Sequence, residues 1–273
     1  MIKKIIGCAD IHIRNYKRLD EYQEQLDKFV DYCKNYVKQY EKGEVCIVIA
    51  GDLFHSKTDI SPECYLAVSK FLSQLDEITE TIVIAGNHDF NASNHDREDP
   101  IAVVFEMSNF KQTRYLDRET NKKTDFVIDQ NIVWCLYSSF DSMGQLDVDD
   151  MRKKYPDKTY VALFHGDVEK SETDLGYESE IGFNVKHFEG VDFGIFGHIH
   201  KRQCLNDSKL VFCGSLIQQD HGESLSNHGF VIWDVNDKTY EEIDIPNENY
   251  GFYTFQIGSI DDIDNDKEVL LNQ

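Results

Sequence analysis

Short polar stretches that could bind metal ions follow five apolar segments of this sequence. They are Asp10-Ile11-His12, Gly51-Asp52-Leu53-Phe54-His55, Gly86-Asn87-His88-Asp89, His165-Gly166 and Gly197-His198-Ile199-His200. Six of the ten histidines occur in these stretches. Imidazole and carboxylate ligands together suit divalent ions such as manganese, iron or zinc. An aspartate could bridge two such ions, which would lower the pKa of a shared water and hold a phosphoryl group for in-line attack.

Each stretch alone is weak evidence for a site. An isolated Asp-x-His or a single histidine after a strand is more often a hydrogen-bonded structural residue, and Gly-His-x-His also occurs without metal. Their joint occurrence after buried strands favours a site, because α/β folds build their sites at the carboxyl ends of strands. Gly51, Gly86 and Gly197 are expected to let the backbone turn sharply beside the metals.

The elements that carry these stretches can be predicted from hydrophobic patterning. Strands are predicted over 3–8, 45–50 and 81–85, alternating with helices over 20–40, 61–75 and 99–107. Gly43 is expected to end the first helix, and Ser61 and Asp99 to cap the next two. The second half predicts a helix over 148–154 and strands over 126–128, 132–137, 160–164, 193–196, 209–213, 229–235 and 239–245. Strand–helix alternation followed by a strand-rich half indicates a mixed α/β sandwich.

Composition limits the class of protein. The 273 residues are 41% hydrophobic and 12% aromatic, which is enough for a packed core and excludes a disordered acidic chain. The sequence contains no run of 18 or more apolar residues, the length needed to span a membrane. The N-terminal apolar stretch is too short for a signal peptide. The seven cysteines form no CxxC pair, so we expect free thiols and a cytoplasmic location.

The five motifs, in this order, resemble those of the calcineurin-like metallophosphoesterase superfamily. In detail the sequence is similar to the SbcD/Mre nucleases of double-strand-break repair, including phage recombination nucleases. The nuclease-type Gly-Asp-Leu-Phe-His is Gly51–His55, and the Gly-His-x-His motif precedes a strand, Gly214-Ser215 and Glu223, as in that family. The resemblance covers about residues 1–245. It implies a four-layer αββα sandwich of two mixed sheets flanked by helices, with the catalytic domain over residues 1–246.

The resemblance also implies a role for each motif residue. One ion would be held by Asp10, His12, Asp52 and His200, and the other by Asp52, Asn87, His165 and His198, with Asp52 bridging. His88 would protonate the leaving oxygen, Asp89 would hold His88 in place, and His55 would position the substrate strand. Two manganese ions are the expected cofactors, with magnesium, iron or zinc as alternatives.

The activity implied is that of a 3′→5′ DNA exonuclease and single-strand endonuclease, working as a homodimer with an SbcC-type ABC ATPase. Family members continue through a DNA-capping domain, so residues 247–273 are expected to be a linker and the start of a truncated or missing cap. Basic residues near the motifs could hold DNA phosphates: Arg14, Lys57, Arg97, Lys201 and Arg202. The other four histidines are expected at the surface: His95, His187, His221 and His228.

Two other functions remain open on the sequence. A small-substrate or cyclic-nucleotide phosphodiesterase could use the same metal site, and a non-catalytic scaffold could keep the fold. The complete ligand set and an intact His88 argue against the scaffold. Protein phosphatases of this superfamily show GDxxDRG and GNHE, which Gly51–Ser56 and Gly86–Asp89 do not match.

The net charge of −22 argues against binding DNA through a basic surface. Residues 234–273 hold eleven acidic and two basic side chains, or −9, so the first 233 residues carry −13. Two divalent ions would add +4 at the site, an attraction for phosphate that acts within about 8 Å at physiological salt. We therefore expect weak duplex binding by this chain alone, with affinity supplied by a partner.

Overall fold

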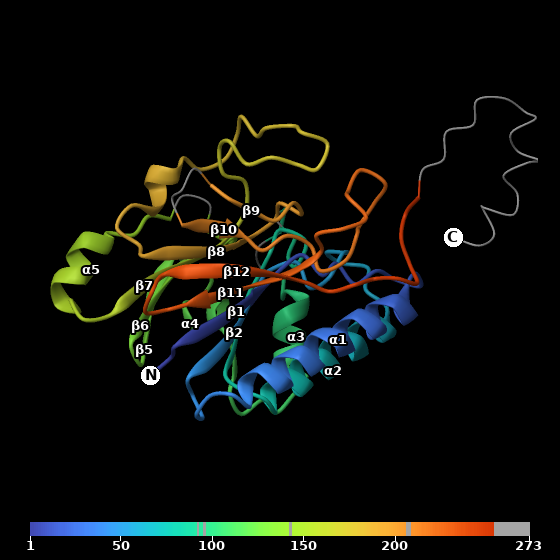
Figure 1. Ribbon diagram of the computed structural model, residues 1–273, viewed down its shortest axis with the longest axis horizontal. Coiled ribbons are helices and arrows are strands. Elements are labelled where there is room, and N and C mark those ends of the chain that lie inside the picture. Colours follow the sequence, from blue (N-terminus) through green and yellow to red (C-terminus); the bar gives the residue numbers. More distant parts are fainter. Residues whose placement is uncertain (92, 95–96, 142–143, 206–208, 254–273) are drawn as a thin grey trace, which may run out of the picture.

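The computed structural model describes residues 1–253, apart from 92, 95–96, 142–143 and 206–208 (Figure 1). The first of two six-stranded sheets has the order β12 (Thr239–Asp244), β11 (Gly229–Asp234), β1 (Lys4–Cys8), β2 (Val45–Ala50), β3 (Thr81–Ile84) and β4 (Thr113–Tyr115). The second has the order β5 (Asp125–Asp129), β6 (Ile132–Tyr137), β7 (Thr159–His165), β8 (Phe193–Gly197), β10 (Leu210–Phe212) and β9 (Gln203–Cys204). Both sheets mix parallel and antiparallel pairs, as expected for this fold class.

Helices cover the outer faces of the two sheets. The helices are α1 (Leu19–Val37), α2 (Pro62–Asp76), α3 (Pro100–Met107), α4 (Leu116–Glu119), α5 (Val148–Lys154) and the 3₁₀ helix η1 (Val185–Phe188). The first three pack on the outer face of the first sheet, while α5 and η1 cover the second sheet (Figure 1). A separate apolar core lies between the sheets. The four-layer αββα sandwich is therefore confirmed.

Strand β2 shows why its sequence is apolar without a break. Val45, Ile47 and Ile49 belong to the core under α1 and α2, whereas Cys46, Val48 and Ala50 belong to the core between the sheets. Alternate side chains thus enter different cores, and both faces of the strand are buried. The same arrangement makes β2 central, between β1 and β3 in parallel register.

The predicted elements differ from the structure mainly at their ends. Helix α1 ends at Val37, well before Gly43, which has a φ of +83° in the following turn. Asp99 caps α3 by accepting a hydrogen bond from the Ala102 N–H, but Ser61 makes no side-chain cap bond at α2. The short elements β4, α4, η1 and β9 were not predicted, because two to four residues carry too little periodicity.

Several sequence predictions concern compartment and boundaries. The described helices include none long and apolar enough to cross a membrane. All seven cysteines are free, and six of them are buried. The linker and start of a cap predicted over 247–273 fall mostly outside the described residues, and 247–253 form no strand. The division at residue 246 stays a prediction.

Candidate metal centre

The polar loops after β1, β2 and β8 begin with unusual backbone conformations. Four non-glycine residues there have positive φ: Asp10 at 53°, His12 at 53°, Asp52 at 54° and His198 at 98°. Such conformations cost on the order of 1–3 kcal/mol each, so the surrounding contacts must hold them in place. Backbone bonds tie the first two loops together, from Asp10 N to Gly51 O at 3.1 Å and from His12 N to Asp52 O at 2.9 Å. The strained turns therefore aim side chains from neighbouring strands at one point.

Glycines give these loops the space to approach one another. A Cβ atom on Gly86 would lie 2.1 Å from Asp52 Oδ1, and one on Gly197 would lie 2.2 Å from the Ala50 carbonyl oxygen. Both distances are far inside van der Waals contact. Gly51 additionally has a φ of +90°. Of the three glycines predicted to serve sharp turns, only Gly51 is required for its φ, and the other two are required for close packing.

Asp52 lies at the centre of the cluster. Its Oδ2 is 3.3 Å from His12 Nε2 and 3.2 Å from His165 Nε2, which lie in the two predicted ligand groups. Its Oδ1 accepts a hydrogen bond of 2.8 Å from the His88 backbone N–H. Asp52 as a whole is 1% exposed. Asp52 thus occupies the position predicted for the bridging ligand.

The remaining predicted ligands surround Asp52. His12 Nε2 lies 3.0 Å from His200 Nε2 and 4.0 Å from Asp10 Oδ1. On the other side, the Asn87 amide oxygen lies 3.2 Å from His165 Nε2 and 2.8 Å from His198 Nδ1. All seven predicted ligands therefore come together. Among the described residues, Asp10 belongs to two groups whose ligand atoms lie within 4.8 Å of one another, one with His12 and His200 and the other with Asp52 and His165.

These spacings fit divalent ions. Ligand atoms about 2.1 Å from one ion, at angles of about 90–110°, lie about 3.0–3.4 Å from one another. The contacts of His12 with Asp52 and His200, and of His165 with Asp52 and Asn87, fall between 3.0 and 3.3 Å. Asp10 is nearly equidistant from both groups, because its Oδ1 is 4.0 Å from His12 Nε2 and from His165 Nε2. The donor set therefore suits two neighbouring ions.

Hydrogen bonds from behind orient three of the imidazoles. His165 Nδ1 donates to the Ala50 carbonyl oxygen at 2.8 Å, which leaves Nε2 as the ligand atom. His200 Nδ1 lies 2.5 Å from Glu223 Oε1, and His198 Nε2 lies 3.3 Å from Asp167 Oδ2. Such outer partners fix the ring and raise its basicity as a ligand.

Sequence reasoning gave no role to Asp167 or Glu223. The Gly-Ser…Glu pattern drew attention to Glu223, but pattern alone did not say which side chain it would contact. Asp167 follows His165 by two residues, so the sequence indicated that it lies near the metal motifs. It did not indicate that Asp167 contacts His198.

The protonation of the cluster depends strongly on burial and on its carboxylates. Burial raises the pKa of Asp52, but the His165 and His12 rings outweigh burial and hold it below its usual value. Burial lowers the pKa of His165 and His200, yet Asp52 raises the first to about 10 and Glu223 raises the second to about 9. Burial also lowers the pKa of His12 well below its ordinary value. Metal binding must therefore displace protons from His165 and His200.

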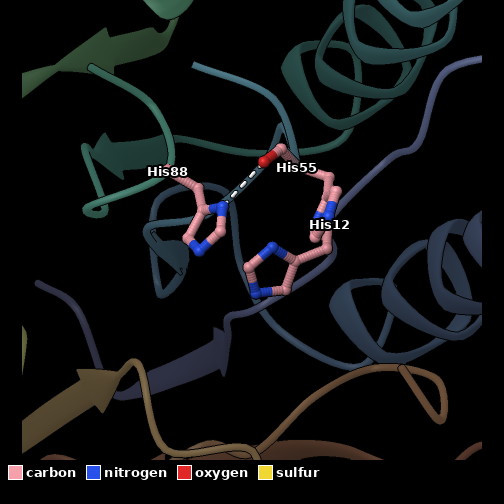
Figure 2. Close-up of side chains that lie close together, drawn as sticks. All are labelled: His12, His55 and His88. Atoms are coloured by element: carbon pink, nitrogen blue, oxygen red, sulfur yellow. Dashed lines mark hydrogen bonds between the residues drawn. The ribbon is translucent and has the colours of Figure 1, made fainter. Parts of the chain in front are cut away.

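A second histidine group borders this centre. Figure 2 shows His12, His55 and His88 with their rings close together, and one ligand nitrogen from each lies within 4.8 Å of the others. His88 Nδ1 donates to the His55 carbonyl oxygen at 2.6 Å, which fixes the ring and makes Nε2 the nitrogen that can act on a bound group. His55 Nε2 accepts from Arg14 Nη1 at 2.7 Å. Burial, together with Arg14 and His88, lowers the pKa of His55 to about 4, so this ring is neutral.

The predicted contact between Asp89 and His88 needs correction. The buried Asp89 carboxylate accepts hydrogen bonds from three backbone N–H groups, those of Leu53 at 3.3 Å, Phe54 at 2.9 Å and Gly86 at 2.9 Å. Burial and the neighbouring Asp52 raise the pKa of Asp89 to about 8. Asp89 therefore joins the loops after β2 and β3, while the His55 carbonyl oxygen holds the His88 ring.

The five basic residues predicted to bind phosphate have different surroundings. Arg14 reaches the site, because it contacts His55 and lies within 3.5 Å of the Gln219 carbonyl oxygen. Lys57 and Arg97 are exposed. Lys201 forms an ion pair of 2.7 Å with Glu172.

Arg202 and His228 are the clearest departures from the predicted surface positions. The Arg202 side chain is 3% exposed and pairs with Glu242 and Asp244 of β12, so it supports the sheet instead of facing a substrate. His228 is buried, and its Nδ1 lies 3.0 Å from Ser215 Oγ. His187 is half-buried, His221 is exposed, and His95 lies outside the described residues.

An αββα sandwich with this ligand set defines a metal-dependent phosphoesterase. The chain belongs to the calcineurin-like phosphoesterase family, whose sequence model matches residues 3–202. It is therefore a hydrolase with a divalent-metal centre.

Among known proteins, the chain is 36% identical over 265 residues to the uncharacterized protein R555 of Acanthamoeba polyphaga mimivirus. The match covers 94% of this chain and 19% of R555, so the chain spans about a fifth of that relative's length. One similar solved structure is a cold-active protein tyrosine phosphatase, with 15% identity, a TM-score of 0.41, and coverage of 89% of this chain and 79% of that one. Another is the cold-active protein-tyrosine phosphatase of a psychrophilic Shewanella species, with 12% identity, a TM-score of 0.35, and coverage of 89% of this chain and 80% of that one.

Proposed function

We propose that this chain is the catalytic domain of a DNA nuclease of the SbcD/Mre type, a two-metal phosphodiesterase with 3′→5′ exonuclease and single-strand endonuclease activity. The observation that carries the proposal is the group of His88, His55 and Arg14 beside the ligand cluster. It supplies a proton donor and a fixed positive charge next to a two-metal site. The nuclease-type motif at Gly51–His55 and the contact of Glu223 with His200 support the same assignment.

The side chains suit phosphodiester hydrolysis. When bound, two divalent ions, manganese in this proposal, would lower the pKa of a water and neutralise charge on the phosphate. His88 can deliver a proton from Nε2 to the leaving oxygen, because Nδ1 is occupied by the His55 carbonyl oxygen. Arg14 is fixed between His55 and Gln219, where its guanidinium can bind a non-bridging phosphate oxygen. Asp52 keeps the two halves of the ligand set together.

The partners follow from the same assignment. We infer that the chain works in the cytoplasm, as a homodimer and in a complex with an SbcC-type ABC ATPase, because its own charge of −22 offers little attraction for duplex DNA. A small-substrate phosphodiesterase remains the second candidate, since the same ligand set would serve it.

The test compares DNA with a small ester. Manganese-loaded protein is incubated with a labelled single-stranded oligonucleotide and, separately, with bis(4-nitrophenyl) phosphate. His88→Asn should reduce DNA cleavage about 10²- to 10⁴-fold. Its metal stoichiometry should be unchanged, because the His88 ring is outside the proposed ligand set.

The matched control is His187→Asn, a half-buried histidine on η1, which should cleave DNA at the wild-type rate. Hydrolysis of the small ester with DNA untouched would overturn the nuclease proposal in favour of the second candidate. Failure to bind divalent metal would leave only the scaffold.

A further inference from the structure

His228 is a buried histidine outside the ligand set of the metal centre. Residues 225–227 before it are exposed, but His228 itself is 7% exposed and directly precedes β11. Its backbone carbonyl oxygen accepts from Ile245 N at 2.9 Å, so the residue is tied to the first sheet. Its ring contacts Ser215, and this contact connects it to the side chain behind the metal ligand His200.

A continuous chain of hydrogen bonds runs from His200 to His228. Glu223 Oε1 lies 2.5 Å from His200 Nδ1, and Glu223 Oε2 accepts from Ser215 Oγ at 3.1 Å. Ser215 Oγ lies 3.0 Å from His228 Nδ1, and His228 Nε2 lies 2.6 Å from the Ser224 carbonyl oxygen. Ser215 is 1% exposed and the Glu223 side chain is 7% exposed, so these groups depend on one another for hydrogen bonds.

The donors and acceptors of this chain determine how many protons it holds. A carbonyl oxygen only accepts, so the contact with Ser224 requires a proton on His228 Nε2. Ser215 has one hydroxyl proton, and its contact with Glu223 uses that proton. The contact of Ser215 Oγ with His228 Nδ1 is then a hydrogen bond only if Nδ1 also carries a proton. Complete pairing therefore requires the imidazolium form of His228.

One other arrangement contains the same number of protons. The carboxyl group of Glu223 could hold the additional proton and donate it to Ser215, whose hydroxyl would then donate to a neutral His228. Two features favour the ring instead. Imidazole is a stronger base than a carboxylate. In addition, His228 Nδ1 lies 3.3 Å from the Ser215 carbonyl oxygen, which can only accept.

We propose that His228 is a buried imidazolium that acts, through Ser215, as a positioning residue for the metal ligand His200. A buried carboxylate requires a compensating positive charge or hydrogen bonds. His200 cannot provide that charge when its Nε2 binds metal, because a ligand imidazole is neutral. The His228 imidazolium thus keeps Glu223 with one oxygen on Ser215 and the other on His200. The inference requires the metal centre alone and holds for either candidate function.

Nitrogen NMR of the metal-free chain tests the charge directly. The protein is labelled with nitrogen-15 histidine, and the His228 signals are assigned by their absence from His228→Phe. At pH 7 both ring nitrogens of His228 should carry protons. In Ser215→Ala, which keeps the ring and removes its connection to Glu223, one ring nitrogen should be unprotonated. A neutral His228 ring in the wild type would overturn the proposal.

Hydrolysis of bis(4-nitrophenyl) phosphate at saturating manganese tests the positioning role. Glu223→Gln should lower kcat about 10- to 100-fold, as loss of a partner behind a metal ligand does. His228→Phe and Ser215→Ala should each lower kcat about 3- to 10-fold and leave KM unchanged, because neither side chain belongs to the ligand set. Adding His228→Phe to Glu223→Gln should lower kcat no further, since both changes act through one carboxylate.

The matched control is His187→Phe, at a half-buried histidine of η1, which should keep the wild-type kcat. Equal kcat values for the wild type and His228→Phe would overturn the positioning role, as would independent losses that multiply in the double variant. Ser215→Ala decides the same question if His228→Phe does not fold. None of these measurements uses DNA, so their outcome is separate from that of the nuclease proposal.

Discussion

Replacing Glu223 by glutamine tests whether this carboxylate determines how His200 binds metal. Glu223 Oε1 lies 2.5 Å from His200 Nδ1, and the side chain is 7% exposed. Its Oε2 accepts from Ser215 Oγ at 3.1 Å and from Gln219 N at 2.9 Å. A glutamine carbonyl oxygen can keep the last two contacts, but its NH₂ group would then face the His200 ring. The change therefore removes one charged hydrogen bond at nearly constant volume.

Two effects of Glu223→Gln on metal affinity oppose each other. A hydrogen bond to a charged group contributes about 1.5–3 kcal/mol, so its loss weakens binding roughly 10- to 150-fold. However, Glu223 also raises the pKa of His200 to about 9, against the lowering effect of burial, and this proton competes with metal. In the wild type that competition weakens binding about 100-fold at pH 7 but only about fourfold at pH 8.5.

The manganese affinity of the wild type, relative to that of Glu223→Gln, should therefore increase with pH. We expect similar manganese affinities for both proteins at pH 7 and an affinity about 3- to 30-fold lower for Glu223→Gln at pH 8.5. Anaerobic titration calorimetry of metal-free protein measures both values, with the exposed Glu98→Gln as control. If the ratio of wild-type to Glu223→Gln manganese affinity stays constant or falls from pH 7 to pH 8.5, the reasoning is refuted.

Two further substitutions test the packing of the site and its surroundings. Gly86→Ala places a Cβ atom 2.1 Å from Asp52 Oδ1, so Asp52 must move and phosphoesterase activity should fall about 100-fold or more. Gly43→Ala, at a glycine distant from the site, should keep its activity although the φ of Gly43 is +83°. Wild-type rates for Gly86→Ala would contradict the packing argument. Burial raises the pKa of Asp117 to about 6, so ionising this acid opposes folding from about pH 4 upward and fully above pH 6. Urea unfolding should show Asp117→Asn gaining about 3 kcal/mol on the wild type between pH 4 and pH 7, and a pH-independent difference would contradict this.

The sequence was sufficient where local pattern and chemistry coincide. Continuous apolar runs predicted β1, β2, β3, β6 and β7, because strands buried on both faces need apolar side chains at every position. The polar stretches after β1, β2, β3, β7 and β8 predicted which side chains meet, since the ends of parallel strands share one edge within each sheet and the two sheets pack against each other. For the same reason the structure brings together all seven predicted metal ligands.

Roles that depend on direction were not accessible in the same way. The sequence placed Asp89 beside His88, yet the chain turns its carboxylate toward the N–H groups of Leu53, Phe54 and Gly86. Arg202 follows the ligand His200 by two residues, but its side chain packs against β12. Neighbours in the sequence can point to opposite sides of a strand or loop, so adjacency predicts proximity without orientation.

What the sequence by itself determined is the mixed α/β class and which polar stretches follow the buried strands, and the resemblance of its motifs to a known family added the αββα arrangement and a predicted ligand set. Only the tertiary structure decided the partners behind the ligands, with Glu223 on His200 and Asp167 on His198. These depend on contacts between segments that are distant along the chain or joined by irregular loops. Such contacts are fixed by packing in three dimensions, and residue periodicity carries no record of them.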